Sequence, residues 1–149
     1  MAHRGESDDI RAIDALMARQ FQSAQWTRGR SADWTAFAAD YFPGAPLYPA
    51  ARPATTSTAE AFVDRMKGLA KTEMPSFIVS YLGSDIQAFG NAAVAFAAIE
   101  MVENEETTVR GIEAFLLIKE DGAWRIASQT WDTEDETKSI PQFLLSRPA

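Results

Sequence analysis

The chain has 149 residues, 46% of them hydrophobic and 23% charged, and a net charge of −7. This length and composition predict one globular domain, 1–149, with a single core. The negative charge disfavours nucleic acid and anionic membrane surfaces as partners, and no apolar run reaches the ~20 residues of a membrane span.

Cysteine is missing from the sequence, and His3 is its only histidine. The lack of cysteine excludes disulfides, thiolate metal sites and a cysteine nucleophile. His3 lies in a polar N-terminal stretch that we expect to fray and that does not resemble a signal peptide, so a cytoplasmic location is the default expectation. Acid–base chemistry must then use carboxylates, tyrosine, lysine or water, and we expect neither a metal nor a cofactor.

Three helices are predicted in the first half of the chain. The first begins at Ser7–Asp9, and its apolar stripe comprises Ile10, Ile13, Leu16, Met17, Phe21 and Ala24. A second, short helix begins at Ser31 and presents Trp34, Phe37, Ala38 and Tyr41 on one face. Four prolines between Phe42 and Thr56 exclude regular helix and central strand there. Ser57 and Glu60 match a capping box that opens the third helix, in which Phe62, Val63, Met66, Leu69 and Ala70 face inward.

The period changes from helical to extended after Pro75. Four strands are predicted over residues 77–89, 92–103, 107–119 and 123–132, with turns at Gly90-Asn91, Asn104-Glu105 and Asp121-Gly122. Short turns between consecutive strands make an antiparallel meander. The fold class is therefore α+β, with three N-terminal helices packed in the concave face of a curved antiparallel sheet. Residues 1–7 and 139–149 are predicted to be tails.

Two of these strands are apolar at odd and even positions alike, over 93–101 and 112–118. A strand with this pattern has both faces covered. Because the helices can cover only one face, we expect a second subunit on the other, which makes the protein a homodimer through the outer sheet face.

The turns predict which side chains share a face. A three-residue loop at 120–122 sets Glu113 opposite Gln129, and a two-residue turn at Asn104-Glu105 sets Phe96 opposite Glu113. One face then carries Val94, Phe96, Ala98, Glu100, Gly111, Glu113, Phe115, Ala127, Gln129 and Trp131. This mixture of apolar bulk and a few polar groups is typical of a ligand cavity. A one-residue slip in either turn would reverse the assignment.

Glu113 is the leading candidate for chemistry. It is either a desolvated carboxylate with a raised pKa that acts as general base or acid, or a buried glutamate satisfied by Gln129 or a tyrosine. Glu100 is expected ~13 Å from Glu113, which disfavours a paired-carboxylate glycosidase. A salt bridge from Glu100 to Arg52 or Arg110 is the more common outcome.

The remaining candidates would form the walls and mouth of the cavity. Trp131 is predicted to be a cavity wall, and Trp34, Tyr48, Phe62 and Met66 could line the opposite wall, although Phe62 and Met66 also suit a plain core. Asp40, at the end of the second helix, could be a base at the mouth, but a solvated helix-end carboxylate is the more common outcome.

The chain resembles the nuclear transport factor-like superfamily, also called SnoaL-like. The resemblance rests on Phe89–Val94, Phe115–Ile126 and Ser128–Trp131, together with the helical preface. It implies a cone-shaped α+β barrel with a cavity at its open end and a homodimer packed through the sheet. Similarity to the association domain of calcium/calmodulin-dependent kinase implies that Glu100 and Trp131 face the cavity.

Other members of that superfamily are ketosteroid isomerases, scytalone dehydratase and polyketide cyclases. The isomerases use an aspartate base with tyrosine and protonated aspartate donors, and Asp40 and Tyr48 are only loose candidates for that pattern. Scytalone dehydratase relies on histidines, which the body of this chain lacks. Fold does not imply function.

Two functions therefore stay open. In the first, the protein is a cofactor-independent isomerase, cyclase or hydro-lyase acting on a small hydrophobic carbonyl compound. Glu113 would transfer the proton, Gln129 and Tyr48 would orient the substrate, and Phe115 and Trp131 would form an apolar wall. In the second, it is a non-catalytic homodimeric module that binds a ligand or only assembles.

Overall fold

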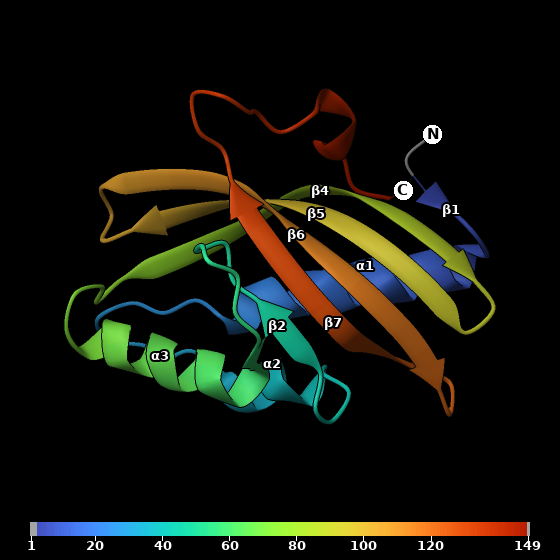
Figure 1. The fold of residues 1–149 in the computed structure, drawn as a ribbon, viewed down its shortest axis with the longest axis horizontal. Helices are drawn as coiled ribbons and strands as arrows, with labels where there is room; N and C mark the ends of the chain where they lie inside the picture. Colours follow the sequence, from blue (N-terminus) through green and yellow to red (C-terminus); the bar gives the residue numbers. More distant parts are fainter. Residues whose placement is uncertain (1–2, 149) are drawn as a thin grey trace.

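The computed structural model describes residues 3–148 and shows an α+β fold (Figure 1), which confirms the predicted class. The helices are α1 (Ser7–Ser23), α2 (Trp34–Ala39), α3 (Ala59–Lys71) and the 3-10 helix η1 (Gln142–Leu144). The strands are β1 (His3–Arg4), β2 (Pro46–Tyr48), β3 (Ser57–Thr58), β4 (Phe77–Phe89), β5 (Ala92–Glu103), β6 (Thr107–Glu120) and β7 (Ala123–Thr133). They form one curved sheet in the order β1-β4-β5-β6-β7-β2-β3, which remains open because β1 and β3 are its edges.

The helices start where side-chain oxygens cap them. Asp33 accepts a hydrogen bond from the Ala36 amide at the start of α2, and Thr58 accepts one from the Ala61 amide at the start of α3. The predicted starts at Ser31 and Ser57 are therefore wrong. Ser57 is instead paired with Leu47 in the short β2–β3 ribbon, which places its backbone in a strand.

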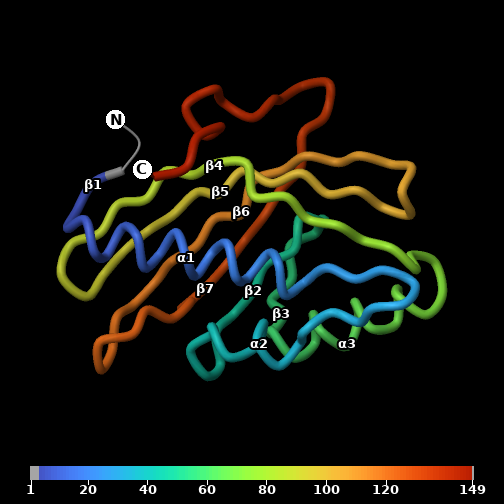
Figure 2. The backbone as a smooth tube through the Cα atoms, turned by 180° about the vertical axis from the view of Figure 1, so that it is seen from behind, coloured from blue at the N-terminus to red at the C-terminus, as the bar shows by residue number. Residues whose placement is uncertain are grey.

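Helix α1 lies across one face of the sheet, as the view in Figure 2 shows. Its stripe residues Ile13, Leu16 and Met17 are completely buried against that face. The inner face of the sheet contributes Ile86, Ala95, Ala97, Ile99, Leu117 and Ile126 to the core. Among the described residues no α-helix covers the opposite, outer face, which is turned toward the viewer in Figure 1.

The β5–β6 connection differs from the predicted two-residue turn. Asn104 and Glu105 both have positive φ, and Glu103 pairs with Thr107 rather than with Glu106. The extra residue shifts the register by one, so Ala97 lies opposite Glu113 where Phe96 was expected. Because strand side chains alternate, this shift moves the even-numbered residues of β5 from the inner to the outer face.

The β6–β7 register also differs, in two steps. Glu120 pairs with Ala123 across a two-residue turn, and a β-bulge interrupts the ladder between Leu116 and Leu117. Each step shifts the pairing by one, so Phe115 lies opposite Gln129 and Glu113 lies opposite Trp131. Two shifts of one residue preserve the face, which keeps Glu113, Gln129 and Trp131 on the same side of the sheet.

Neither end of the described chain is the tail that was predicted. Strand β1 pairs in parallel with β4, and the segment after Ile140 packs on β4 with Leu144 buried. Gly83 allows this contact because a Cβ there would lie 2.2 Å from the Leu144 carbonyl oxygen. Met1, Ala2 and Ala149, which complete the predicted tails, lie outside the described residues.

Candidate functional site

A cavity of about 280 Å³ lies between the helices and the inner face of the sheet. Its wall is mainly apolar and comes from α1, α2, α3 and strands β4 to β7. Its polar lining residues are Gln20, Tyr41, Arg65, Glu103, Glu113, Gln129, Asp132 and Thr133. A concave, mainly apolar space with a few converging polar groups is the usual form of a small-molecule site.

Three of these polar side chains form a chain of hydrogen bonds on one wall. The Tyr41 hydroxyl donates to Gln129 Oε1, and Gln129 Nε2 donates to Glu113 Oε1 at 2.5 Å. Tyr41 fixes the orientation of the Gln129 side-chain amide. Because the Tyr41 hydroxyl donates its proton, the amide oxygen of Gln129 must face it. The amide nitrogen is then directed at Glu113.

The pKa of the Glu113 carboxyl is far above its ordinary value. Burial raises its pKa to about 8, although the hydrogen bond from Gln129 acts in the opposite direction. A carboxylate is poorly solvated in an apolar wall, so the neutral acid predominates at pH 7. The part of the side chain that remains open faces the cavity, and no described residue donates to or accepts from Oε2.

Besides the hydrogen bond of its hydroxyl, Tyr41 is held in place by backbone hydrogen bonds that its two chain neighbours make with Ile126. The Ile126 amide donates to the Asp40 carbonyl at 2.8 Å, and the Phe42 amide donates to the Ile126 carbonyl at 2.9 Å. Burial, together with the charges of Glu113 and Asp40, raises the Tyr41 pKa well above its ordinary value. The phenol therefore stays protonated and remains a donor to Gln129 throughout the usual pH range.

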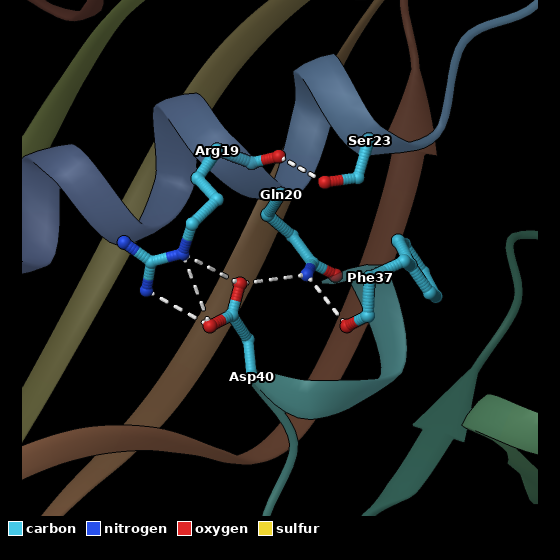
Figure 3. A network of polar contacts seen from close by, with 5 residues as sticks. All are labelled: Arg19, Gln20, Ser23, Phe37 and Asp40. Atoms are coloured by element: carbon cyan, nitrogen blue, oxygen red, sulfur yellow. Dashed lines mark hydrogen bonds and ion pairs between the residues drawn. The ribbon is translucent and has the colours of Figure 1, made fainter. Parts of the chain in front are cut away.

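Asp40 lies outside the cavity and belongs to a structural cluster between α1 and α2 (Figure 3). Arg19 Nη2 donates to Asp40 Oδ1 at 2.8 Å, and Gln20 Nε2 donates to Asp40 Oδ2 at 3.3 Å and to the Phe37 carbonyl at 3.0 Å. The carboxylate is buried and paired, so both expectations for Asp40 are wrong: it is neither a base at the mouth nor a solvated helix end.

Four other predicted site residues do not line the cavity. Phe115 is a core residue 6.1 Å from the Phe21 ring, and Trp34 packs on Trp26 and Phe37. Glu100 lies on the outer face, because of the shifted β5–β6 register, and pairs with Arg110 at 3.3 Å.

Tyr48 also lies on the outer face. It pairs with Thr130, whose neighbour Gln129 points inward, so the tyrosine points away from the cavity. Phe62, Met66, Glu113, Gln129 and Trp131 do line the cavity, and the Phe62 and Trp131 rings form a T-shaped pair with 5.6 Å between their centroids.

Tyr41 is the site residue that the sequence analysis missed. It was assigned only to the apolar face of the second helix, whereas it follows α2 and bridges to β7. The usable signal was that a buried tyrosine needs a partner for its hydroxyl. The same reasoning was applied to Tyr48, which is exposed.

Among the described residues, no group of three or more His, Cys, Asp or Glu side chains could hold a metal ion. Within the same range, no helix is long and apolar enough to cross a membrane.

No protein-family profile and no curated protein sequence matches the chain. Similar folds are found among solved structures. An NTF2-like protein of unknown function from Pseudomonas putida KT2440 has 14% sequence identity and a TM-score of 0.69, with 91% of this chain and 95% of that chain covered.

Two further solved structures carry names of enzymes. A putative scytalone dehydratase from Novosphingobium aromaticivorans DSM 12444 has 14% identity and a TM-score of 0.66, with 95% of this chain and 93% of that chain covered. The hexachlorocyclohexane dehydrochlorinase LinA-type3 from Novosphingobium barchaimii LL02 has 10% identity and a TM-score of 0.68, with 86% and 88% covered. At such identities the likeness concerns the fold, and this chain has the nuclear transport factor-like fold, which is related to the cystatin-like fold.

Proposed function

We propose that the cavity binds a small, mainly apolar carbonyl compound and that Glu113 moves a proton on it. The observation that carries the proposal is the state of the Glu113 carboxyl. One oxygen is fixed by Gln129, the other has no partner among the described residues, and the pKa is about 8. A base is most effective when its pKa is close to the working pH.

In the first step, the Glu113 carboxylate takes a proton from the carbon next to the substrate carbonyl. The electron pair of the broken C–H bond forms a carbon–carbon double bond, and the carbonyl oxygen becomes an enolate oxygen. In the second step, the carboxylic acid can return its proton to the γ carbon of a β,γ-unsaturated substrate; the double bond moves into conjugation as the enolate becomes a carbonyl again, which is an isomerisation. Alternatively, it gives the proton to a hydroxyl group that departs from the β carbon as the enolate becomes a carbonyl again, which is the loss of water. Both outcomes use the same base and balance without a cofactor.

The developing negative charge on the substrate oxygen needs a donor. Trp131 lies directly opposite Glu113 in the β6–β7 ladder and lines the cavity. Its indole N–H makes no hydrogen bond within residues 3–148, so it is available to a ligand. We assign Trp131 this role, which the sequence analysis had given to Tyr48. Gln129, which was also expected to orient the substrate, orients Glu113 instead.

The size of the cavity limits the ligand. Pockets for small molecules usually range from about 300 to 1,000 Å³, and this cavity of about 280 Å³ is just below that range. A ligand of one or two rings fits within this volume. The similar structures named as a dehydratase and a dehydrochlorinase carry the names of elimination enzymes, which agrees with the reaction class but does not identify the substrate.

The proposal is tested by exchange of substrate protons. One- and two-ring ketones, such as indanone and tetralone, are incubated with the protein in D₂O, and loss of the signal of the protons next to the carbonyl is followed by proton NMR. We expect exchange that rises tenfold per pH unit and levels off above pH about 8, because only the carboxylate of Glu113 is a base.

Glu113→Gln should reduce this exchange at least ~100-fold, the usual contribution of a general base. Glu100→Gln is the matched control, since Glu100 is a strand glutamate on the outer face, and it should leave exchange unchanged. Exchange that is equally fast in Glu113→Gln would refute the assigned role.

The alternative is a non-catalytic binding module. It is favoured by the hydrogen bond between Gln129 and Glu113, because a buried glutamate with a partner has a structural reason to exist. Ketones that shift the NMR signals of cavity residues at every pH, without any exchange of their own protons, would support this alternative.

A further inference from the structure

Gln20 is a polar residue at a core position of α1. It lies four residues after Leu16 and three after Met17, which belong to the buried stripe of the helix. Its side chain is therefore turned inward with that stripe, and only 1% of the residue is exposed. A polar side chain in such a position is costly unless its polar atoms have hydrogen-bond partners.

The amide nitrogen of Gln20 has two partners, which fix the orientation of the amide. Nε2 donates to the Phe37 carbonyl at 3.0 Å and to Asp40 Oδ2 at 3.3 Å. In Figure 3 the nitrogen is turned toward both of these oxygens. Because both partners are acceptors, the amide oxygen cannot exchange places with the nitrogen. Oε1 is therefore the atom of the side chain that is left for another partner.

That oxygen is buried and accepts no hydrogen bond from any residue in the range 3–148. Two other donors in the cavity wall are already used, since Tyr41 donates to Gln129 and Gln129 donates to Glu113. A buried amide oxygen without a donor is costly. Because Gln20 lines the cavity, a molecule bound there can supply the donor that the protein does not.

The burial and charge around Gln20 favour a hydroxyl group as this donor. An ammonium group would bring a full charge into a mainly apolar wall, and the neutral amide oxygen could not balance that charge. A hydroxyl group is small and uncharged, and one hydrogen bond satisfies its proton and the amide oxygen together. Arg65 and Asp132 also line the cavity but are exposed, so a charged group of a ligand would be better placed beside them than beside Gln20.

We propose that Gln20 Oε1 accepts a hydrogen bond from a hydroxyl group of the ligand and that the cavity thereby selects hydroxylated carbonyl compounds. The carbonyl part of this inference rests on the proposed function. Gln20 comes from α1 and Glu113 from β6, so the hydroxyl that Gln20 binds and the carbonyl beside Glu113 are separate groups of the ligand. A ketone of two fused rings with a hydroxyl group on its aromatic ring meets both requirements.

A cavity with an unpaired acceptor discriminates against a ligand that has no donor for it. A ligand without the hydroxyl group leaves Oε1 unpaired, whereas the hydroxylated ligand gains a hydrogen bond in a buried place. We therefore expect the hydroxylated member of a matched pair to bind at least ~10-fold more tightly.

The first test compares ligands on the wild-type protein. Tetralones with a hydroxyl group at each position of the aromatic ring, their methyl ethers and tetralone itself are titrated and followed by NMR at pH 6. At this pH Glu113 is the neutral acid, so its carboxylate does not compete for the hydroxyl proton. At least one hydroxytetralone should bind ~10-fold more tightly than tetralone, and its methyl ether, which has no donor, should lose this gain. The proposal is wrong if no hydroxytetralone binds more tightly than tetralone.

The second test removes the acceptor. Gln20→Met keeps a side chain of similar length without Oε1, and it should weaken binding of the preferred hydroxytetralone ~10-fold while binding of tetralone stays the same. Gln22→Met is the matched control, since Gln22 is exposed on the same helix, and it should keep the preference for the hydroxyl group. An equal loss for both ligands in Gln20→Met would indicate a merely structural role and overturn the proposal. The comparison on the wild type decides the matter if Gln20→Met does not fold.

A third comparison separates this inference from the role of Glu113. Indane and the indanol with its hydroxyl group on the aromatic ring have no carbonyl group, so they test Gln20 alone. The indanol should bind ~10-fold more tightly than indane to the wild type and equally to Gln20→Met. A preference for the hydroxyl group without any exchange of ketone protons in D₂O would support this inference and refute the proposed catalysis. Exchange without that preference would do the reverse.

Discussion

Glu113 makes the stability of the folded protein depend on pH. Its carboxyl titrates near 4.5 in the unfolded chain and near 8 in the folded protein. Between these pH values the unfolded chain releases a proton that the folded protein retains. The folded protein therefore loses stability as the pH rises from about 4.5 to about 8, and this loss is complete above that range.

Glu113→Gln should remove this pH dependence and stabilise the protein at neutral pH. At ~1.4 kcal/mol per pKa unit, the gain approaches ~5 kcal/mol above pH 8 and is smaller to the extent that water in the cavity screens the charge. Urea denaturation at pH 4, 6 and 8 measures it. A variant whose stability differs from the wild type by the same amount at all three pH values would contradict the raised pKa.

The contact between α1 and α2 includes an ion pair in which only the carboxylate is buried. Asp40 has 7% of its side chain exposed, whereas its partner Arg19 is 50% exposed. Arg19 therefore serves mainly to neutralise a carboxylate that cannot reach water. Because Asp40 immediately precedes Tyr41, the same pair holds the tyrosine that orients Gln129.

Arg19→Met should destabilise the protein by ~3 kcal/mol, because removing one partner of a buried pair leaves an uncompensated charge. Arg11→Met is the matched control, since Arg11 pairs with the exposed Asp8 on the same helix, and it should change stability by less than ~0.5 kcal/mol. Equal losses for the two variants in urea denaturation would show that Asp40 is not effectively buried.

At the scale of the whole molecule, both chain ends are anchored on β4. Strand β1 pairs with it, and the C-terminal segment contacts it through Gly83 and through Arg147, which pairs with Asp14 at 2.8 Å and stacks on Tyr81. Both ends lie near the same strand in Figure 1. The C-terminal segment therefore lies along β4, where the Ser84 amide donates to the Ser146 carbonyl at 3.0 Å, and reaches α1 through the Arg147–Asp14 pair.

Gly83→Ala should release this segment, because the added Cβ would lie 2.3 Å from the Ser146 amide nitrogen. Amide hydrogen exchange over 141–148 should become fast, and the free energy of unfolding should fall by ~1–3 kcal/mol. Gly68→Ala is the control: nothing lies within 4 Å of its added Cβ, and alanine favours a helix interior, so stability should rise slightly. Unchanged protection of 141–148 in Gly83→Ala would disprove the anchoring.

The sequence by itself determined the local elements. Hydrophobic periodicity placed α1 and the four long strands almost to the residue, and the single histidine limited the possible chemistry to other groups. The helix and the strands could be predicted because the spacing of apolar side chains and the turn propensity depend only on residues close together in the chain.

Only the tertiary structure decided which side chains meet. One extra residue in the β5–β6 turn moved Glu100 to the outer face, and a bulge after Leu116 restored Glu113 and Gln129 to a shared face. The Pro-rich segment gave no periodic signal for β2, so the position of Tyr48 beside Thr130 could not be read from it. Register depends on single-residue irregularities and on long-range pairing, and neither leaves a periodic trace in the sequence.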